Sequence, residues 1–504
     1  MQSLYDYLGS ILEIAGGTTV DVVAHGVDNT GETDAAEAIN TLIAGGGTFF
    51  FPKGTYLLRS QLVVPSNTSI IGEGSETVFL AAASMDAVYH TICTPNASNI
   101  NARLCFNEAV EGHPAVADYI TAYDHDIKLA NFTVNGNWQN RNLTNWNKNY
   151  TGGGVVVTRE PGTNIEVQAA YNVVIEGVTA INGIQHNFNI RAGAYSYNRG
   201  ITYECLFPSY DCVIKDCTAK NERYDDCFTT HDSYNILIDN CVCIMDNNAN
   251  GTYSGAVSNG FEIDDGSRFV EVRNCKAYYA VCGFQAKGHD NTPPAHDVTF
   301  SNCTAFYTQF GFVLSSGPAS SYTTYETIEG RCRNINILHC AIIKPYAPSN
   351  VTDWLGSLIF ISMKNTLNVK ISDLYIENTG APAGVQNDYG APLRTLCLNE
   401  RERCFNTLIS NVQITSPITN TYSSSALFLI PSDSSNTIIK DIVLNGFTGN
   451  PIVRAGLNSS GYYLTIDGIY SPRIASGDLM LQVASVTSES GIILKGSRTN
   501  MEFL

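Results

Sequence analysis

A recurring alternation of apolar and polar residues organises the middle of the chain. Five segments superpose with an aromatic residue in the third place: HNFNIR (186–191), DCFTTH (226–231), NGFEID (259–264), CGFQAK (282–287) and FGFVLS (310–315). Residues two apart in a strand share a face, so the aromatic residue and the one two places later point inward. The other positions form two outward columns, one with Asn189, Thr229, Glu262, Gln285 and Val313, the other with Arg191, His231, Asp264, Lys287 and Ser315.

A second repeat places an Asn or Asp six residues before an apolar or Cys residue. The pairs are Asp126/Phe132, Asn172/Val178, Asp211/Cys217, Asn235/Cys241, Asp297/Cys303, Asn334/Cys340, Asn368/Leu374, Asn406/Val412 and Asn436/Ile442. Phe269 takes the polar place in the rung that ends at Cys275. A polar residue that bonds the backbone at a bend, followed by an inward hydrophobe, suits one corner of a coil. The two repeats predict an all-β solenoid of stacked parallel strands.

The cysteines follow the same repeat. Of the 15 in the chain, Cys217, Cys241, Cys275, Cys303 and Cys340 fall one per rung in equivalent places. Equivalent places in a parallel solenoid stack about 4.8 Å apart, so we expect an internal ladder of reduced thiols. No CxxC pair occurs, which argues against a zinc site.

The composition of the chain limits the classes of molecule that we expect it to bind. The 504 residues carry a formal net charge of −18, which argues against nucleic acid as the main partner. An acidic polysaccharide stays open, because the outward columns contain Arg191 and Lys287. No apolar run is long enough to span a membrane. The first 17 residues contain an early acidic residue and no basic start, so we expect a short amphipathic helix rather than a signal peptide.

The N-terminal region supplies a resemblance. We expect a helix that Thr33 or Asp34 caps and that ends at Leu42 or Ile43, followed by short strands. The motifs DVVAHGVDNTGETDAAEAI and FPKGTY resemble the cap of the pectate-lyase-like superfamily, which includes phage tailspikes, polysaccharide lyases and epimerases. This resemblance implies a right-handed, single-stranded parallel β-helix with an N-terminal helical cap. Together with the reduced cysteines and the absence of a signal peptide, the tailspike-like cap predicts a virion tail protein made in the host cytoplasm, with an extracellular protein as the alternative location. The resemblance alone implies a homotrimer.

The predicted organisation has four parts. Residues 1–20 form an N-terminal segment, 21–125 the cap and first coils, 126–450 the β-helix with its groove, and 451–504 the last coils or a C-terminal β element. Loops at 193–210 and 244–258, rich in Tyr, Asn and Gly, are expected to wall the groove.

The ionisable residues of the outward columns are the candidates for chemistry. His231 and Asp264 share a column on successive segments, so we expect their side chains to lie close together. Glu262 is in the next column, Asp226 precedes His231, and His186 matches Asp226 one rung earlier. Paired carboxyls suit glycosidic hydrolysis. A base with a neighbouring cation suits elimination or epimerisation of a uronate.

A second resemblance concerns the same residues. YDDCFTTH (224–231) followed by NGFEID (259–264) is similar to the catalytic rungs of mannuronan C5-epimerases and alginate lyases. The resemblance places His231 and Asp264 on that family's catalytic His and one Asp. The family's Tyr falls on Asp226, and its other Asp falls on Thr229, so the match is partial.

The leading hypothesis is a phage depolymerase that binds and cleaves a bacterial surface or capsular polysaccharide by hydrolysis. The catalytic candidates are Asp226, His231, Glu262 and Asp264; the substrate-binding candidates are His186, Asn189, Arg191, Asp265, Gln285, Lys287 and His289. The alternatives are a uronate lyase or C5-epimerase that uses His231 and Asp264, and a spike that grips glycan without cleaving it. No cofactor is required, although the oxygen ligands of Asp264 and Asp265 suit Ca²⁺. Asp265 is also interpreted as a turn residue. The expected partners are the polysaccharide and other phage tail proteins.

Overall fold

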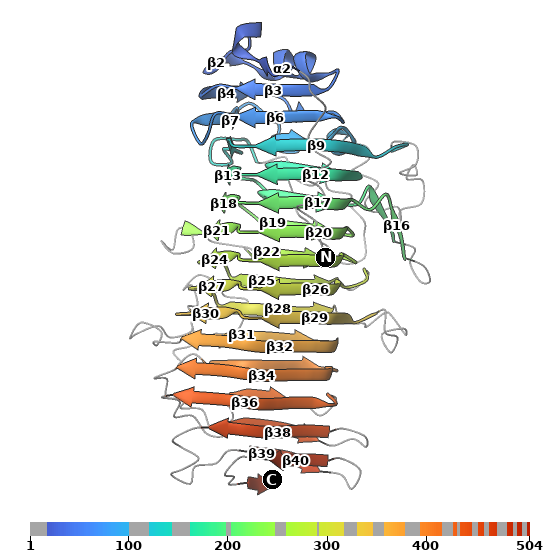
Figure 1. Ribbon diagram of the computed structural model, residues 1–504, viewed down its shortest axis with the longest axis vertical. Helices are drawn as coiled ribbons and strands as arrows, with labels where there is room; N and C mark the ends of the chain where they lie inside the picture. The colour runs from blue at the N-terminus through green and yellow to red at the C-terminus, as the bar shows by residue number, and fades with distance from the viewer. Residues whose placement is uncertain are drawn as a thin grey trace. The chain divides into compact units, whose positions relative to one another are not determined.

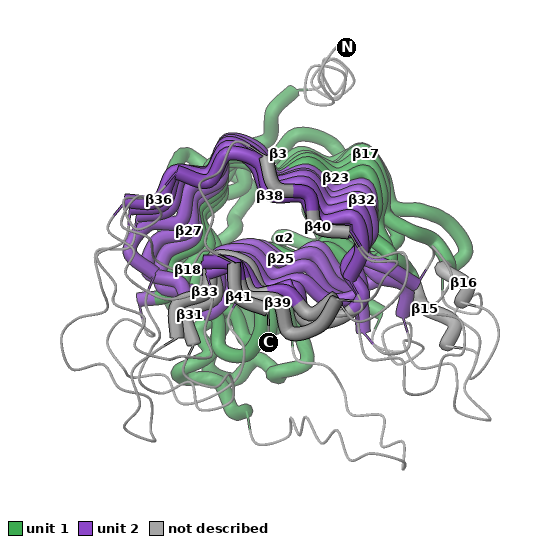
Figure 2. Tube along the Cα trace, turned by 90° about the horizontal axis from the view of Figure 1, so that it is seen from below, with its two compact units in different colours: residues 1–245, 256–258, 266–271 green, residues 246–255, 259–265, 272–504 purple. Residues whose placement is uncertain are grey.

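The computed structural model describes the chain in two compact units, which Figure 2 colours separately. The first unit comprises residues 1–245, 256–258 and 266–271, and the second comprises residues 246–255, 259–265 and 272–504. Described residues are 18–99, 120–143, 162–197, 203–246, 259–289, 292–316, 330–345, 357–377, 394–415, 427–430, 434–445, 452–457, 463–470, 481–486, 491–495 and 501–503. The predicted N-terminal helix and residues 247–258 of the second predicted loop lie outside them.

Most strands of the first unit are short and pair in parallel. They are β1 (Val20–Asp21), β2 (Thr30–Asp34), β3 (Gly47–Phe51), β4 (Gly54–Leu58), β5 (Leu62–Val63), β6 (Thr68–Gly72), β7 (Thr77–Ala81), β8 (Ile92–Cys93), β9 (Asp124–Ala130), β10 (Thr133–Asn135), β11 (Ile165–Gln168), β12 (Ala170–Glu176), β13 (Thr179–Ile181), β14 (Phe188–Arg191), β17 (Tyr210–Lys215), β18 (Thr218–Lys220), β19 (Asp226–His231), β20 (Tyr234–Asp239) and β21 (Val242–Ile244). Three parallel runs recur: β6–β9–β12–β17–β20, β7–β10–β13–β18–β21 and β5–β8–β11–β14–β19. Figure 1 shows β9, β12 and β17 stacked one above another. Strand, bend and strand repeat along the chain, as the two sequence repeats predict.

The start of the first unit carries a helix, as expected. Besides the short elements η1 (Val23–His25) and α3 (Pro95–Ser98), helix α2 spans Ala36–Ile43 and buries Ile39 and Ile43 completely. Asn40 joins it to the first coils, because its amide donates to the carbonyl of Gln61 and accepts from the N–H of Val63, both at 2.9 Å. The predicted capping residue needs correction. Ala35 occupies the N-cap position, and the Asp34 carboxylate instead accepts the N–H groups of Ala36 and Arg59.

The second unit continues the same architecture. Its strands are β22 (Asn259–Asp264), β24 (Lys276–Tyr278), β25 (Cys282–Gly288), β26 (His296–Ser301), β27 (Thr304–Phe306), β28 (Phe310–Ser316), β29 (Cys332–Leu338), β30 (Ala341–Ile343), β31 (Ser357–Lys364), β32 (Thr366–Glu377), β33 (Arg394–Glu402), β34 (Phe405–Thr415), β35 (Phe428–Ile430), β36 (Thr437–Asn445), β37 (Val453–Leu457), β38 (Tyr463–Tyr470), β39 (Leu481–Val486), β40 (Gly491–Lys495) and β41 (Met501–Phe503), while β23 (Arg268–Arg273) contains residues of both units. The strands expected after residue 450 are β38, β39 and β40, and they pair in parallel with the strands before them. They are therefore further coils of the solenoid. The chain has the predicted all-β, parallel β-helix fold.

The first of the two predicted loops contains regular structure. Strands β15 (Ala194–Tyr197) and β16 (Tyr203–Leu206) pair in antiparallel fashion within residues 193–210. This hairpin follows directly after Arg191, at the end of β14, and returns the chain to β17. The sequence had indicated only a Tyr-, Asn- and Gly-rich loop here.

The corner residues adopt a left-handed backbone conformation, which explains their identity. All ten, from Asp126 to Asn436 and including Phe269, have φ between 52° and 58°. Asn and Asp tolerate this region better than other residues that carry a side chain. Their side chains bond each other across coils: the Asn334 amide donates to Asp297 at 2.9 Å, and the Asn406 amide donates to Asn368 at 3.0 Å. Corner side chains therefore bond one another from coil to coil.

The inward residues form the expected stacked core. The rings of Phe188 and Phe228 lie 4.8 Å apart in the first unit, and those of Phe284 and Phe312 lie 5.2 Å apart in the second. All four are fully buried. The predicted cysteine ladder is also present, because the five repeat cysteines are buried and unbridged. Among the described residues, no helix has the length and apolar character needed to cross a membrane.

Candidate functional site

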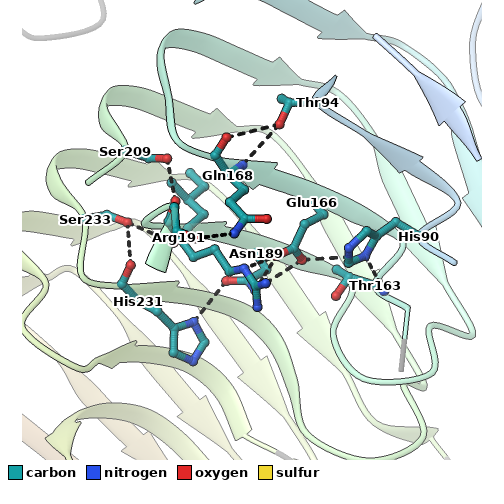
Figure 3. Close-up of polar contacts among 12 residues, drawn as sticks. His90, Thr94, Thr163, Glu166, Gln168, Asn189, Arg191, Ser209, His231 and Ser233 are labelled. Atoms are coloured by element: carbon teal, nitrogen blue, oxygen red, sulfur yellow. Dashed lines mark hydrogen bonds and ion pairs between the residues drawn. The ribbon is translucent and has the colours of Figure 1, made fainter. Parts of the chain in front are cut away.

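The outward face of β11, β14 and β19 gathers polar side chains in the first unit. The register places Glu166 beside Asn189 and Asn189 beside Thr229; in the next column, Gln168 lies beside Arg191 and Arg191 beside His231. These columns match the prediction within this unit and extend it by one strand, β11. Figure 3 shows the resulting cluster.

Glu166 is the centre of this first cluster, although the sequence analysis did not single it out. Its carboxylate lies 2.9 Å from Nε of Arg191. The amide of Asn189 donates to both carboxylate oxygens, at 3.1 and 3.2 Å. All three side chains are at least 97% buried. Arg191, predicted as a substrate clamp, is therefore paired with an internal carboxylate.

Asn189 also determines the proton position on His231. A carboxylate only accepts hydrogen bonds, so the NH₂ group of Asn189 must face Glu166 and its oxygen must face His231. That oxygen lies 3.0 Å from Nδ1 of His231, so Nδ1 carries the proton and donates. Neutral His231 is then left with Nε2 as a proton acceptor. This arrangement is that of an oriented base.

A second pair lies beside this cluster in the same unit. Nδ1 of His186 lies 3.4 Å from Oδ2 of Asp226, and both side chains are nearly fully buried. The rings of His186 and His231 are 5.8 Å apart. The structure thus brings together five predicted residues of the first unit. Four are His186, Asn189, Arg191 and His231, and the fifth, Asp226, contacts His186.

Lys287 organises the cluster of the second unit. Its ammonium nitrogen lies 3.2 Å from Oε1 of Glu262 and 2.8 Å from Oδ2 of Asp264. Asn259 donates to Glu262, and the N–H of Asp265 donates to Asp264. Both acids are almost completely buried, whereas Lys287 retains 18% exposure of its side chain. Gln285 lies beside Glu262 in the register of β22 and β25.

His289 completes the second cluster. Its Nδ1 lies 2.9 Å from Asp265 and 3.5 Å from Asp264, while Nε2 lies 3.1 Å from the ammonium of Lys287. The negative charge of Asp264, and then that of Asp265, raises the pKa of His289 to about 10. The side chain of His289 is about half exposed, and the charge of the Lys287 ammonium beside Nε2 opposes this rise in pKa.

Asp265 is both a turn residue and part of this cluster. Its φ of 41° is left-handed, and its carboxylate accepts from Thr292 as well as His289. Oxygens of Asp264 and Asp265 and a nitrogen of His289 lie within 4.8 Å of one another. Because Lys287 and His289 already contact these carboxylates, Ca²⁺ would have to displace a protein cation. The Ca²⁺ hypothesis stays a prediction.

The pairing predicted between His231 and Asp264 joins residues of different units. His231 belongs to the first unit and Asp264 to the second. Each cluster is defined within its own unit, and the pairing stays a prediction.

The family relationship follows from sequence comparison. The family model described as rhamnogalacturonase A/epimerase, pectate lyase-like, matches residues 19–311. The chain belongs to this family. The match includes the cap, the first cluster and the second cluster, so the predicted superfamily is confirmed.

Phage appendage proteins are among the proteins to which the chain is similar. The pre-neck appendage protein of Bacillus phage B103 is 30% identical over 283 residues, which are 56% of this chain and 28% of that protein. The chain therefore matches well under half the length of this relative. The crystal structure of pre-mature phi29 gene product 12 has a TM-score of 0.70 at 20% identity, covering 96% of this chain and 57% of that one. A tailspike mutant of E. coli bacteriophage HK620 has a TM-score of 0.54 at 11% identity, covering 98% and 81%. These two structures support the β-helical fold.

Proposed function

We propose that this chain is part of a phage virion appendage that binds a bacterial surface polysaccharide and hydrolyses its glycosidic bonds. The description of its family joins a rhamnogalacturonase with an epimerase, which supports action on glycans. The names of its relatives support a virion location and association with other phage tail proteins. The homotrimer expected from the superfamily resemblance stays a prediction.

The contact of one ammonium with two carboxylates carries the proposal of hydrolysis. Nζ of Lys287 is 3.2 Å from Glu262 and 2.8 Å from Asp264, and one oxygen of each acid lies within 4.8 Å of the other. Retaining glycosidases place their two carboxyls about 5–5.5 Å apart, whereas inverting enzymes need about 6.5–9.5 Å to admit a water. The spacing therefore favours a retaining hydrolase.

The roles follow from the surroundings of the two acids. The ammonium of Lys287 and the N–H of Asp265 both contact the Asp264 carboxylate and orient it, which suits a nucleophile. Glu262 makes the longer contact with Lys287, at 3.2 Å against 2.8 Å for Asp264, and we assign it the remaining role of acid and base. In the first step Asp264 attacks the anomeric carbon while Glu262 protonates the leaving oxygen; water then hydrolyses the glycosyl ester.

One observation favours a second candidate function. Asn189 holds His231 with Nδ1 protonated, so that Nε2 can accept a proton. A base of this kind could remove the C5 proton of a uronate, giving a lyase or an epimerase. This candidate uses the first cluster and leaves Glu262 without a catalytic role.

The two functions give different products. We would incubate the purified chain with a panel of capsular and cell-wall polysaccharides and follow reducing ends together with the ultraviolet absorbance of unsaturated uronates. Hydrolysis yields reducing ends alone, and elimination yields both signals. Asp264→Asn should abolish hydrolysis, while Asp467→Asn on β38 serves as a matched control away from the cluster. Binding without either signal would contradict an enzymatic role and leave the glycan-gripping spike.

A further inference from the structure

We infer that Cys227 and Cys243 form a disulfide bond when the chain folds under oxidising conditions. Cys227 is the second residue of β19 and Cys243 is the middle residue of β21, and both belong to the first unit. Neither is one of the five cysteines of the repeat ladder. The inference does not depend on the proposed action on polysaccharides.

The two thiols are in direct contact in the reduced chain. Sγ of Cys243 lies 2.7 Å from Sγ of Cys227, and both side chains are fully buried. A disulfide bond is about 2.05 Å long, so the sulfurs need to approach by only about 0.7 Å. A tetrahedral metal ion with bonds of about 2.3 Å would hold two thiolates roughly 3.8 Å apart. The short contact therefore favours a covalent bond over a shared metal ion.

The corner at which these two strands approach each other is narrow, as another coil shows. In the sequence repeat, Gly260 takes the place of Cys227 and Ala277 takes the place of Cys243. A Cβ atom added to Gly260 would lie 2.8 Å from Cβ of Ala277, and the following coil repeats this distance with another glycine and alanine. A disulfide joins residues whose Cβ atoms are about 3.5–4.5 Å apart. The backbone therefore brings the two cysteines as close as a disulfide requires.

The bond has to form while the chain folds, because the finished fold shields both sulfurs. Burial raises the pKa of the Cys227 and Cys243 thiols, and a thiol that stays protonated does not attack a disulfide. In the unfolded chain both thiols are accessible. They are only 16 positions apart, so the loop between them closes at little entropic cost.

The reaction is thiol–disulfide exchange with a small-molecule disulfide such as oxidised glutathione. The thiolate of one cysteine attacks this reagent, which gives a mixed disulfide and releases one small thiol. The thiolate of the other cysteine then attacks the protein sulfur of the mixed disulfide and releases the second small thiol. The two cysteines are oxidised by two electrons, and their two protons end on the two released thiols.

The bond closes one coil of the β-helix on itself. It joins the start of β19 to β21, and β19 also carries Asp226, which contacts His186. A cross-link over a loop of this length restricts the unfolded chain and thereby stabilises the folded one. The melting temperature of the oxidised chain should therefore exceed that of the reduced chain.

The test compares the full chain made in a bacterial host with an oxidising cytoplasm and in one with a reducing cytoplasm. Free thiols are alkylated in denaturant, and the chain is digested with trypsin. Residues 224–267 contain no Lys or Arg, so Cys227, Cys241 and Cys243 stay on one peptide. From the oxidising host we expect one alkyl group on this peptide, at Cys241, and from the reducing host we expect three. Circular dichroism confirms that both forms are folded.

Two variants separate this bond from any other that an oxidising host introduces. Cys243→Ala introduces the residue that lies beside Cys243 in the preceding coil, Ala219, so the fold should be retained and Cys227 should be alkylated. Cys241→Ala is the matched control, because it removes a buried sulfur from the same peptide. The wild type and Cys241→Ala should melt a few degrees higher when made in the oxidising host, and Cys243→Ala should lose this difference.

Three alkyl groups on the peptide of a folded wild-type chain from the oxidising host would overturn the inference. A bond between Cys227 and Cys241, identified by fragmentation of the peptide, would also overturn it. The same holds if the peptide of Cys243→Ala still contains a disulfide.

Discussion

The two clusters contain the same kinds of side chain in different arrangements. In the first unit, one carboxylate, Glu166, holds an arginine and an asparagine, and the asparagine orients His231. In the second unit, one ammonium, Lys287, holds two carboxylates close together. The first arrangement sets the position of a proton, and the second sets the distance between two acids. The outward positions of β-helix strands can therefore hold either a histidine with a fixed proton or two carboxylates at short distance.

The two units should differ most in how their free energy of unfolding depends on pH. Burial raises the pKa of Glu222, in the first unit, to about 8. The folded state then binds a proton that the unfolded state releases above about pH 4.5, so the free energy of unfolding should fall by several kcal/mol as the pH rises to 8. Denaturant titrations at pH 5 and pH 8.5 measure this change. Glu222→Gln should remove most of this fall in unfolding free energy. If the variant loses as much stability between pH 5 and pH 8.5 as the wild type does, the raised pKa of Glu222 is not the cause.

In the second unit, the contribution of His289 to stability should be lost at higher pH than that of Glu222. The pKa of His289 is raised above that of the unfolded chain, so its stabilising contribution is complete below about pH 6.5 and is lost as the pH rises through about 10. The exposed half of the ring is screened by water, so we expect a smaller effect than that of Glu222. His289→Gln, in the same titrations extended to alkaline pH, should flatten the curve in this upper window only.

Removing Lys287 should break the second cluster without affecting the first. Lys287→Met leaves Glu262, Asp264 and Asp265 close together with one cation fewer, and we expect a loss of about 2 kcal/mol in unfolding free energy. Lys276→Met, an exposed position on β24, is the matched control and should change stability by less than about 0.5 kcal/mol. Equal effects of the two substitutions would mean that the ammonium does not hold the acids.

Asn189→Leu should disturb the first cluster selectively. Loss of the oxygen that accepts from Nδ1 frees His231 to adopt either tautomer. Nitrogen NMR shifts of His231 would report this change directly. If His231 acts as the base, activity should fall about tenfold, with a changed pH profile. Asn336→Leu on β29 is the control. A His231 tautomer unaffected by Asn189→Leu would contradict the orientation argument.

Substitution of Phe269 should change the free energy of unfolding least. It occupies a corner where the other nine coils have Asn or Asp, with a φ of 53° and 60% of its surface exposed. Phe269→Asn should raise the unfolding free energy by about 0.5–1 kcal/mol, because Asn tolerates the left-handed region better. Thermal unfolding measures the change. A destabilised variant would indicate that the ring makes a contact worth more than the backbone strain.

The sequence predicted the faces of the strands well, because a period of two fixes which side chains share a face. The columns containing Asn189 and Glu262, the inward phenylalanines and the corner residues are all found within their units. Glu166 was missed because its segment has Ile165 where the other segments have an aromatic residue; apolar alternation at Ile165 and Val167 was the available signal.

The partners of the charged side chains could not be predicted from the same pattern. Alternation places Lys287 and Asp264 on one face, but it does not determine which oxygen an ammonium reaches. Long side chains reach neighbouring columns, as Lys287 does in contacting both Glu262 and Asp264. The capping of α2 was wrong for a related reason, because Asp34 lies one residue too early for the N-cap and bonds Arg59 as well.

The stereochemistry of cleavage tests the central claim most directly. Proton NMR of the first products released from a cleaved polysaccharide distinguishes the two anomers before they interconvert. We predict that the wild type retains the anomeric configuration and that Asp264→Asn loses at least roughly 10³-fold in rate, while Asp467→Asn is unaffected. Inversion, or an unsaturated product that persists in Asp264→Asn and disappears in His231→Gln, would contradict the account.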